Sequence, residues 1–220
     1  LGLGRAPGSD QVTSRALRRS LGTDPDEFPR DVMELMAYFE GNGPVRAVPG
    51  EGHAVPIWIL GSSLFGAQLA AMLGLPYAFA SHFAPAQMLN AIAVYRARFR
   101  PSRHLDKPYV MLGFNVAAAD TDTKARYLAS SWQQSFVNLR SGRPGRLPPP
   151  VEGYVESLPQ QSRMLLDQVL SCSAIGSPGV VADGIRAFVE KTGADELMLT
   201  SNMYDHAARR HSFEIVTGLI

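Results

Sequence analysis

The sequence predicts an α/β fold in which short parallel strands alternate with amphipathic helices. Short apolar runs of strand length recur along the chain, and most precede a segment whose apolar residues have helical spacing. The clearest unit, residues 56–85, is PIWILGSSLFGAQLAAMLGLPYAFASHFAP, which predicts a strand, a turn, a helix and a second strand. Because strand–helix–strand connections bring strands together in parallel, we expect a parallel sheet covered by helices.

The first strand of that unit, residues 57–60, is an uninterrupted apolar run, which predicts a strand buried on both faces. The turn that ends it consists of Gly61, Ser62 and Ser63, and either serine can cap the following helix. Larger apolar residues form one stripe of this helix, and small residues between them allow close approach to a sheet. Gly74 is expected to end the helix.

The other elements follow the same alternation. Asp120 or Thr121 is expected to cap one helix, and Ser177 with Pro178 to start another. Six strands are too few for a closed (β/α)₈ barrel of about 250 residues, so either the sheet is open or early strands are absent. The predicted strands lie near 1–4, 57–60, 77–80, 109–116, 171–175 and 196–200, and the helices over 30–42, 84–100, 120–140, 162–170, 178–191 and 201–218.

Composition narrows the function classes. With 220 residues and 45% hydrophobic content, the chain can bury a sizeable core, and we expect one domain over 1–220. A net charge of +1 gives no broad cationic surface, so nucleic acid is not an expected partner. The single cysteine, Cys172, excludes an internal disulfide and favours the cytoplasm. No segment has the length and apolarity of a membrane span, and no signal peptide is evident.

A phosphate site is predicted at the turn Gly61 to Ser63. Ligands of parallel α/β folds bind at the carboxyl ends of strands, where helix N-termini offer free N–H groups and a partial positive charge. Gly2, Gly4 and Gly8 nearly match the G-x-G-x-x-G fingerprint, but no helix opens after them, so a Rossmann-type dehydrogenase is the weakest hypothesis. The segment around Arg5 is either a surface turn or a loop that brings this cation to an anion.

Three further features are a loop rich in proline, the single cysteine and two histidines near the end of the sequence. Residues 139–153, LRSGRPGRLPPPVEG, exclude regular secondary structure and predict a lid, a mobile linker or a partner contact. Cys172 is expected to be a buried packing residue and not a nucleophile. His206 and His211 are spaced five apart, which does not place them on one helix face, so we expect surface histidines and no metal site.

Four segments together resemble the bacterial-luciferase-like flavin-dependent monooxygenases. They are GLGRAPGSD at 2–10, SRAL at 14–17, the 56–85 unit, and GADELMLTSNMYDHAARRHSFEI at 193–215, and the resemblance covers essentially the whole chain. It implies a (β/α)₈ TIM barrel that binds reduced FMN without a covalent bond and uses O₂ to oxidise a small organic substrate. Residues 1–5 align with the fourth barrel strand, so roughly three βα units, about 100 residues, are expected to be missing from this chain.

The resemblance also implies site residues and partners. A flavin reductase and a homodimer are expected, and residues 139–153 match a loop that closes over the ring and excludes water. Family members carry a histidine near the reacting atoms in the units that this chain lacks, so activity of this chain alone is not implied. The residues assigned to the phosphate are Arg5, Arg15, Gly61, Ser62 and Ser63, and those beside the isoalloxazine ring are Ser81 and His82.

Two alternatives stand beside the monooxygenase hypothesis. One is a non-catalytic flavin-binding or dimerising protein, a shortened paralogue of the enzyme, which would bind flavin without consuming oxygen. The other is a reductase on the same barrel that uses the deazaflavin F420, which the absorption spectrum of the bound cofactor would distinguish.

Overall fold

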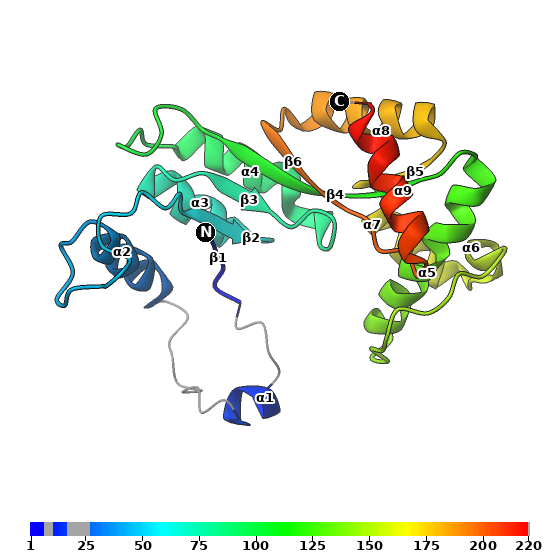
Figure 1. Cartoon of the computed structure of the whole chain (residues 1–220), viewed down its shortest axis with the longest axis horizontal. Helices are drawn as coiled ribbons and strands as arrows, with labels where there is room; N and C mark the ends of the chain where they lie inside the picture. Colours follow the sequence, from blue (N-terminus) through cyan, green and yellow to red (C-terminus); the bar gives the residue numbers. More distant parts are fainter. Residues whose placement is uncertain (7–10, 17–26, 220) are drawn as a thin grey trace. The chain divides into compact units, whose positions relative to one another are not determined.

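The computed structural model describes residues 1–6, 11–16 and 27–219. The chain forms two compact units (Figure 1). The first unit comprises Leu1–Ala78 and Asn90–Tyr109, and the second comprises Phe79–Leu89 and Val110–Ile220. Each unit is described by itself below.

Strands and helices alternate through both units, as the sequence predicts. Up to residue 109 the elements are β1 (Gly2–Leu3), α1 (Gln11–Ala16), α2 (Phe28–Phe39), β2 (Trp58–Gly61), α3 (Leu64–Leu73), β3 (Tyr77–Phe79), the 3₁₀ helix η2 (Pro85–Gln87) and α4 (Met88–Arg98). The elements that follow are β4 (Val110–Ala118), α5 (Asp122–Arg140), α6 (Tyr154–Ser157), α7 (Gln160–Leu170), β5 (Ser173–Gly176), α8 (Pro178–Thr192), β6 (Glu196–Thr200) and α9 (His206–Thr217).

In the first unit, β1 pairs in parallel with β2, with Gly2 opposite Trp58, and β3 is the next strand in the order. The prediction of a β2 region buried on both faces is wrong. Ile57 and Ile59 are buried, whereas Leu60 is 42% exposed, so side-chain alternation produces one buried and one more open face.

Helix α3 meets the sheet mainly through its small residues. Gly66 and three alanines are buried; of the predicted large-residue stripe, Leu69 is buried as well, whereas Met72 is 62% exposed. A Cβ on Gly66 would lie 3.4 Å from the ring of Tyr77 and 3.7 Å from Ile59, so the helix backbone lies close to the strands. The predicted close approach is therefore confirmed, but through the small face. Gly74 ends the helix in the left-handed conformation, φ 63°, as predicted.

The second unit is built around β4 (Figure 1). This nine-residue strand pairs in parallel with β5 through Asn115–Ala118 and with β6 through Met111–Asn115. Helices α5 and α8 pack on β5, and α9 packs on β4. An apolar cluster forms between α5, α7 and the end of β4, and its buried members are Ala117, Ala119, Ala125, Leu128, Ala129, Trp132, Val137, Leu158, Leu166, Val169 and Met203.

Several predicted boundaries shift for local reasons. The last helix begins at His206 and not at residue 201, because the Asp205 carboxylate accepts a hydrogen bond from the Ala208 N–H and caps it. Thr121, and not Asp120, caps α5 by accepting from the Lys124 N–H. Ser177 and Pro178 start α8 as predicted. Within the described residues, no helix combines the length and apolarity that a bilayer crossing needs.

Candidate functional site

The turn between β2 and α3 has no side-chain cap from its own N-cap residue. Ser63 is the N-cap residue of α3, yet its side chain makes no capping hydrogen bond, and the first turn of the helix contains no acidic residue. A Cβ on Gly61 would meet nothing within 4 Å, and Ser62 is exposed. The hydroxyl of the buried Tyr77 donates to the Ser63 carbonyl at 3.2 Å, and this hydrogen bond holds the backbone of the turn in place. Burial raises the pKa of Tyr77, so this hydroxyl stays protonated.

Arg5 lies at the same turn. Its guanidinium carbon is 4.1 Å from the centre of the Phe65 ring, in the first turn of α3. A Cβ on Gly4 would come within 3.1 Å of the Leu60 carbonyl oxygen, so the chain that leaves β1 runs against the end of β2. Arg5 is exposed, and no carboxylate within the described ranges forms an ion pair with it. The backbone of Arg15 belongs to α1, but its side chain lies outside the described part.

A second strand–serine–helix turn, between β5 and α8, is already occupied by a protein carboxylate. Asp122 Oδ1 accepts a hydrogen bond from the Ser177 N–H at 2.7 Å. This backbone hydrogen bond is the main reason why the pKa of Asp122 is lowered. This role of Asp122 could not be predicted from the sequence alone. The two turns therefore differ: a carboxylate fills the α8 terminus, whereas a cation stands beside the open α3 terminus.

Ser81 and His82 follow the carboxyl end of β3 and belong to the second unit. Ser81 is fully buried, and its hydroxyl donates to the Gly113 carbonyl at 2.6 Å. The His82 carbonyl accepts from the side-chain amide of Asn115 at 2.8 Å, and the Asn115 carbonyl oxygen accepts from the Thr200 hydroxyl at 2.7 Å. Burial lowers the pKa of His82.

Three residues of this cluster were missed from the sequence: Gly113, Asn115 and Thr200. A signal for two of them was present, because a glycine and an asparagine interrupt the otherwise apolar strand VMLGFNVAA. An isolated glycine within a strand often marks a close approach of another group. Here that group is the His82 imidazole, since a Cβ at position 113 would lie 1.9 Å from its Nδ1.

The exclusion of regular structure from residues 139–153 is confirmed for residues 141–153, whereas residues 139 and 140 form the end of α5. The loop is held at both ends to its own unit. Arg140 lies between the rings of Phe83 and Phe136, 5.3 and 5.2 Å from their centres, and the Val151 N–H donates to the Ser130 hydroxyl on α5. Residues 141–146, between these anchors, are exposed. The lid role stays a prediction.

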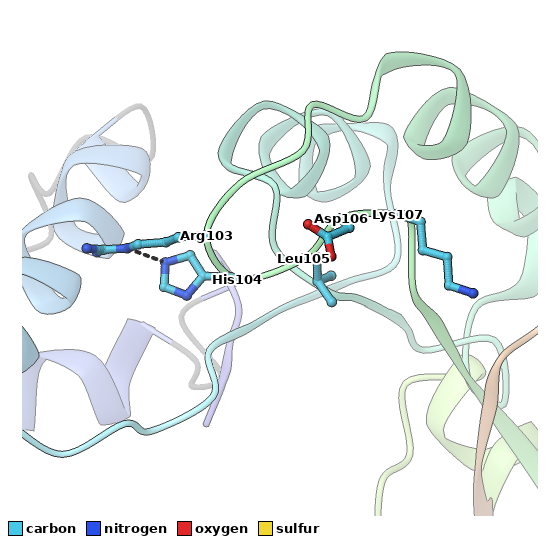
Figure 2. A pocket seen from close by; sticks show the side chains of 5 residues that line it. All are labelled: Arg103, His104, Leu105, Asp106 and Lys107. Atoms are coloured by element: carbon cyan, nitrogen blue, oxygen red, sulfur yellow. Dashed lines mark hydrogen bonds between the residues drawn. The ribbon is translucent and has the colours of Figure 1, made fainter.

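Elsewhere in the first unit, residues Arg103 to Lys107 line a solvent-open hollow of about 430 Å³ (Figure 2). Arg103 pairs with Glu40, and its Nε donates to His104 Nε2 at 3.3 Å. Burial and the neighbouring Arg103 charge lower the pKa of His104. The hollow contains none of the predicted site residues and is lined by one loop only, so it supports no ligand assignment.

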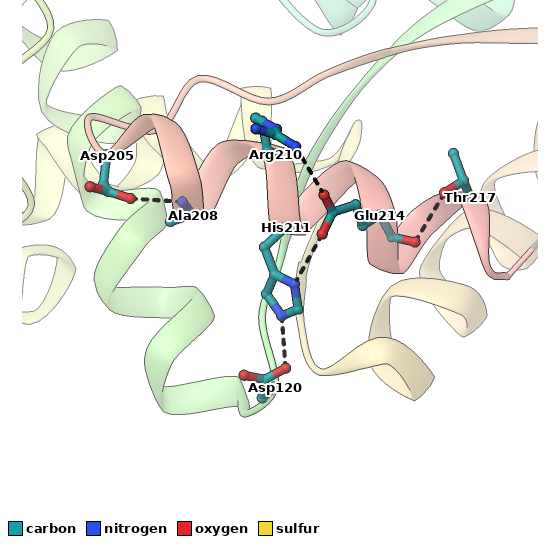
Figure 3. Close-up of polar contacts among 7 residues, drawn as sticks. All are labelled: Asp120, Asp205, Ala208, Arg210, His211, Glu214 and Thr217. Carbon is teal, nitrogen blue, oxygen red and sulfur yellow. Dashed lines mark hydrogen bonds and ion pairs between the residues drawn. The ribbon is translucent and has the colours of Figure 1, made fainter.

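The remaining candidates behave as structural residues. His211 is on the surface, as predicted, where its Nε2 lies 2.9 Å from Asp120 Oδ1 and its Nδ1 3.6 Å from Glu214 (Figure 3). The hydrogen bond to Asp120 is the main reason why the pKa of His211 is raised. Cys172 is buried, as predicted, and burial raises its pKa. Among the described residues, no group of three or more histidine, cysteine or acidic side chains is arranged to hold a metal ion.

Comparison with known proteins identifies the family. The model of the luciferase-like monooxygenases matches residues 12–196. The chain belongs to the luciferase-like monooxygenase family. A family member from Escherichia coli strain K12, named luciferase-like monooxygenase, is 49% identical over 98% of this chain and 65% of its own length. The uncharacterized protein YvbT of Bacillus subtilis is 48% identical over 100% of this chain and 66% of its own. The chain thus spans about two thirds of the length of these relatives.

Solved structures of related proteins agree. The crystal structure of apo-MsnO8 superimposes with a TM-score of 0.82 and 28% identity, covering 100% of this chain and 67% of that protein. The FMN complex of a type II Baeyer–Villiger monooxygenase from Pseudomonas putida gives 0.60 at 19% identity, over 98% and 68%. A coenzyme F420 dependent reductase from Methanopyrus kandleri gives 0.62 at 14%, over 100% and 72%. The last two show the fold alone, and together the structures confirm the luciferase-type barrel class.

Proposed function

We propose that this chain is part of a flavin-dependent monooxygenase that uses reduced FMN and O₂ to oxidise a small organic substrate. The observation that carries the proposal is the position of Arg5 over Phe65, beside the open N-terminus of α3. Uncapped N–H groups, the helix dipole and a guanidinium without a carboxylate partner in the described ranges suit a phosphate dianion. The family resemblance supports FMN as the ligand that would bring such a phosphate.

The residues at this turn divide the binding task. The first-turn N–H groups of α3 would donate hydrogen bonds to the phosphate oxygens, and Arg5 would neutralise part of the phosphate charge. Tyr77 would keep the Ser63 carbonyl turned away from the anion by holding it in a hydrogen bond. The open space at Gly61 leaves room for a ligand close to the backbone. When bound, a reduced flavin supplies the electrons with which O₂ is activated.

Other parts of the proposal rest on the family resemblance. Arg15 would be a second cation at the phosphate, Ser81 and His82 would face the ring, and residues 139–153 would exclude water from it. A flavin reductase as partner, a homodimer and a cytoplasmic location belong to the same proposal. If the bound cofactor has the absorption spectrum of a deazaflavin, F420 takes the place of FMN in this proposal. Flavin binding without oxygen consumption would indicate a non-catalytic paralogue.

The test separates phosphate recognition from ring recognition. The affinities of FMN and of riboflavin, which lacks the phosphate, are measured by quenching of flavin fluorescence for the unaltered chain and for Arg5→Ala. Loss of one charge-assisted contact should weaken FMN binding about 10- to 100-fold and leave riboflavin unchanged. Ser62→Asp should weaken FMN binding as well, through charge repulsion.

Arg46→Ala is the matched control, because Arg46 is an exposed arginine of the same unit that pairs with Glu51. It should leave both affinities unchanged. An equal loss of FMN affinity in Arg5→Ala and Arg46→Ala, or an equal loss of FMN and riboflavin in Arg5→Ala, would show that the phosphate does not bind at this turn.

A further inference from the structure

Two hydrogen bonds fix the backbone at His82 to the neighbouring strand β4. The Ser81 hydroxyl donates to the Gly113 carbonyl at 2.6 Å, and the Asn115 amide donates to the His82 carbonyl at 2.8 Å. Ser81 is 0% and Asn115 6% exposed, so both bonds are shielded from water. The segment that carries the imidazole therefore has a fixed position within the second unit.

The His82 carbonyl determines which way the Asn115 amide points, because a carbonyl oxygen can only accept and the NH₂ end must therefore face it. Asn115 Oδ1 then faces Thr200, whose hydroxyl donates to it at 2.7 Å. This second hydrogen bond holds the Asn115 amide in place. Through these two hydrogen bonds, Thr200 at the end of β6 takes part in holding His82.

Gly113 provides the surface on which the imidazole rests. A Cβ at position 113 would lie 1.9 Å from His82 Nδ1 and 2.9 Å from its Cε1 and Cγ, so any other residue here would displace the ring. The Cα–H bond of glycine that takes the place of this Cβ points at Nδ1. A C–H group is a weak donor, and it is compatible with a nitrogen lone pair but not with a second N–H.

Nδ1 is buried and has no hydrogen-bond partner in the part of the chain that the structure describes. Burying an N–H group without an acceptor costs more free energy than burying an unprotonated ring nitrogen. Nδ1 is therefore the unprotonated nitrogen, and Nε2 carries the proton. Burial lowers the pKa of His82 below its ordinary value, which keeps the ring neutral at pH 7. The residue as a whole is only half-buried, so the ring is not enclosed.

We propose that Gly113, Asn115 and Thr200 are positioning residues that hold His82 as a neutral imidazole with a fixed Nε2–H donor, and that this donor contacts a carbonyl oxygen of the cofactor ring. The second half rests on the proposed function for the identity of the ligand. The first half depends only on contacts within the second unit.

The first half is tested without cofactor by nuclear magnetic resonance of ¹⁵N-labelled histidine, with the His82 signal assigned from its loss in His82→Gln. The unaltered chain should show one neutral tautomer, protonated at Nε2. Gly113→Ala should produce mixed tautomers and move the His82 pKa back toward its ordinary value. Thr200→Val should weaken the tautomer preference, and Thr200→Ser, which keeps the hydroxyl, should restore it.

Gly179→Ala is the control, because a Cβ at Gly179 meets nothing within 4 Å. It should leave the His82 signal unchanged. An Nδ1-protonated His82 in the unaltered chain would overturn the positioning proposal. So would a His82 signal that is the same in Gly113→Ala and Thr200→Val as in the unaltered chain.

The second half is tested with riboflavin, which presents the ring without the phosphate, and with FMN. Binding should shift the His82 Nε2–H resonance, and His82→Gln should weaken riboflavin binding about 2- to 10-fold, the range of one neutral hydrogen bond. Flavin binding with an unmoved His82 resonance would overturn the ring contact and leave the proposed function intact. Absence of binding by either flavin would overturn the proposed function and the ring contact, while the cofactor-free spectra still decide the positioning role.

Discussion

The hydroxyl of Tyr95 offers a quantitative test of how the first unit is held together. It donates to the Leu75 carbonyl at 2.9 Å and accepts from the Tyr109 N–H at 3.1 Å, and Tyr95 is fully buried. Tyr95→Phe keeps the ring, which packs on Tyr77 and Phe99 with centroids 5.4 and 5.6 Å away, and removes only the oxygen. The variant therefore isolates one polar bridge.

The expected loss follows from the two hydrogen bonds that the variant removes. Loss of the bond to the buried Leu75 carbonyl should cost about 1–3 kcal/mol and loss of the bond from the half-buried Tyr109 N–H about 1 kcal/mol, so the free energy of unfolding should fall by about 2–4 kcal/mol. Urea unfolding followed by circular dichroism measures this. Tyr204→Phe, at an exposed tyrosine, is the control and should change stability by less than about 0.5 kcal/mol. If Tyr95→Phe lowers the free energy of unfolding by no more than Tyr204→Phe does, the Tyr95 hydroxyl does not bridge Leu75 and Tyr109.

Two further predictions concern the second unit. His211 has a raised pKa beside Asp120, so this pair stabilises the fold fully below about pH 6.5 and the contribution is lost as pH rises through the folded pKa. The Tm difference between the unaltered chain and His211→Gln should accordingly shrink from about pH 6 to about pH 9, and a constant difference would contradict the pairing. In α8, Gly184→Ala should destabilise by about 1–3 kcal/mol because its Cβ would lie 2.9 Å from that of Ala174, whereas Gly179→Ala should be neutral or stabilising; equal effects on Tm would refute the close approach.

Local chemistry explains why many elements could be predicted. Gly74 and Gly193 end their helices in the left-handed conformation, and Ser177 with Pro178 starts α8, because these preferences belong to the residues themselves. The buried face of α3 was not predictable in the same way. Periodicity favours the larger residues, but of these the contact with the sheet buries Leu69 and leaves Met72 exposed, and Gly66 allows Tyr77 to approach.

The candidate sites also contain some features that the sequence predicts and others that depend on tertiary packing. The turn at Gly61 to Ser63 could be found from the sequence, because a strand followed by Gly-Ser-Ser and a helix has a local signature. The equally good signature before α8 could not be rejected from the sequence, because the carboxylate that fills it comes from Asp122, 55 residues away. Nor could the sequence reveal that His82 rests on Gly113, which lies on another strand.

By itself, the sequence determined the α/β alternation, the glycine that ends α3, the family and the turn that we propose for the phosphate, because short-range geometry and family motifs are written in consecutive residues. The tertiary structure alone decided that Arg5 lies over Phe65, that Asp122 closes the second turn, and that β4 and β6 hold His82. These contacts join residues that are far apart in the chain, and they depend on which strands become neighbours and which side chains the packed backbone leaves room for.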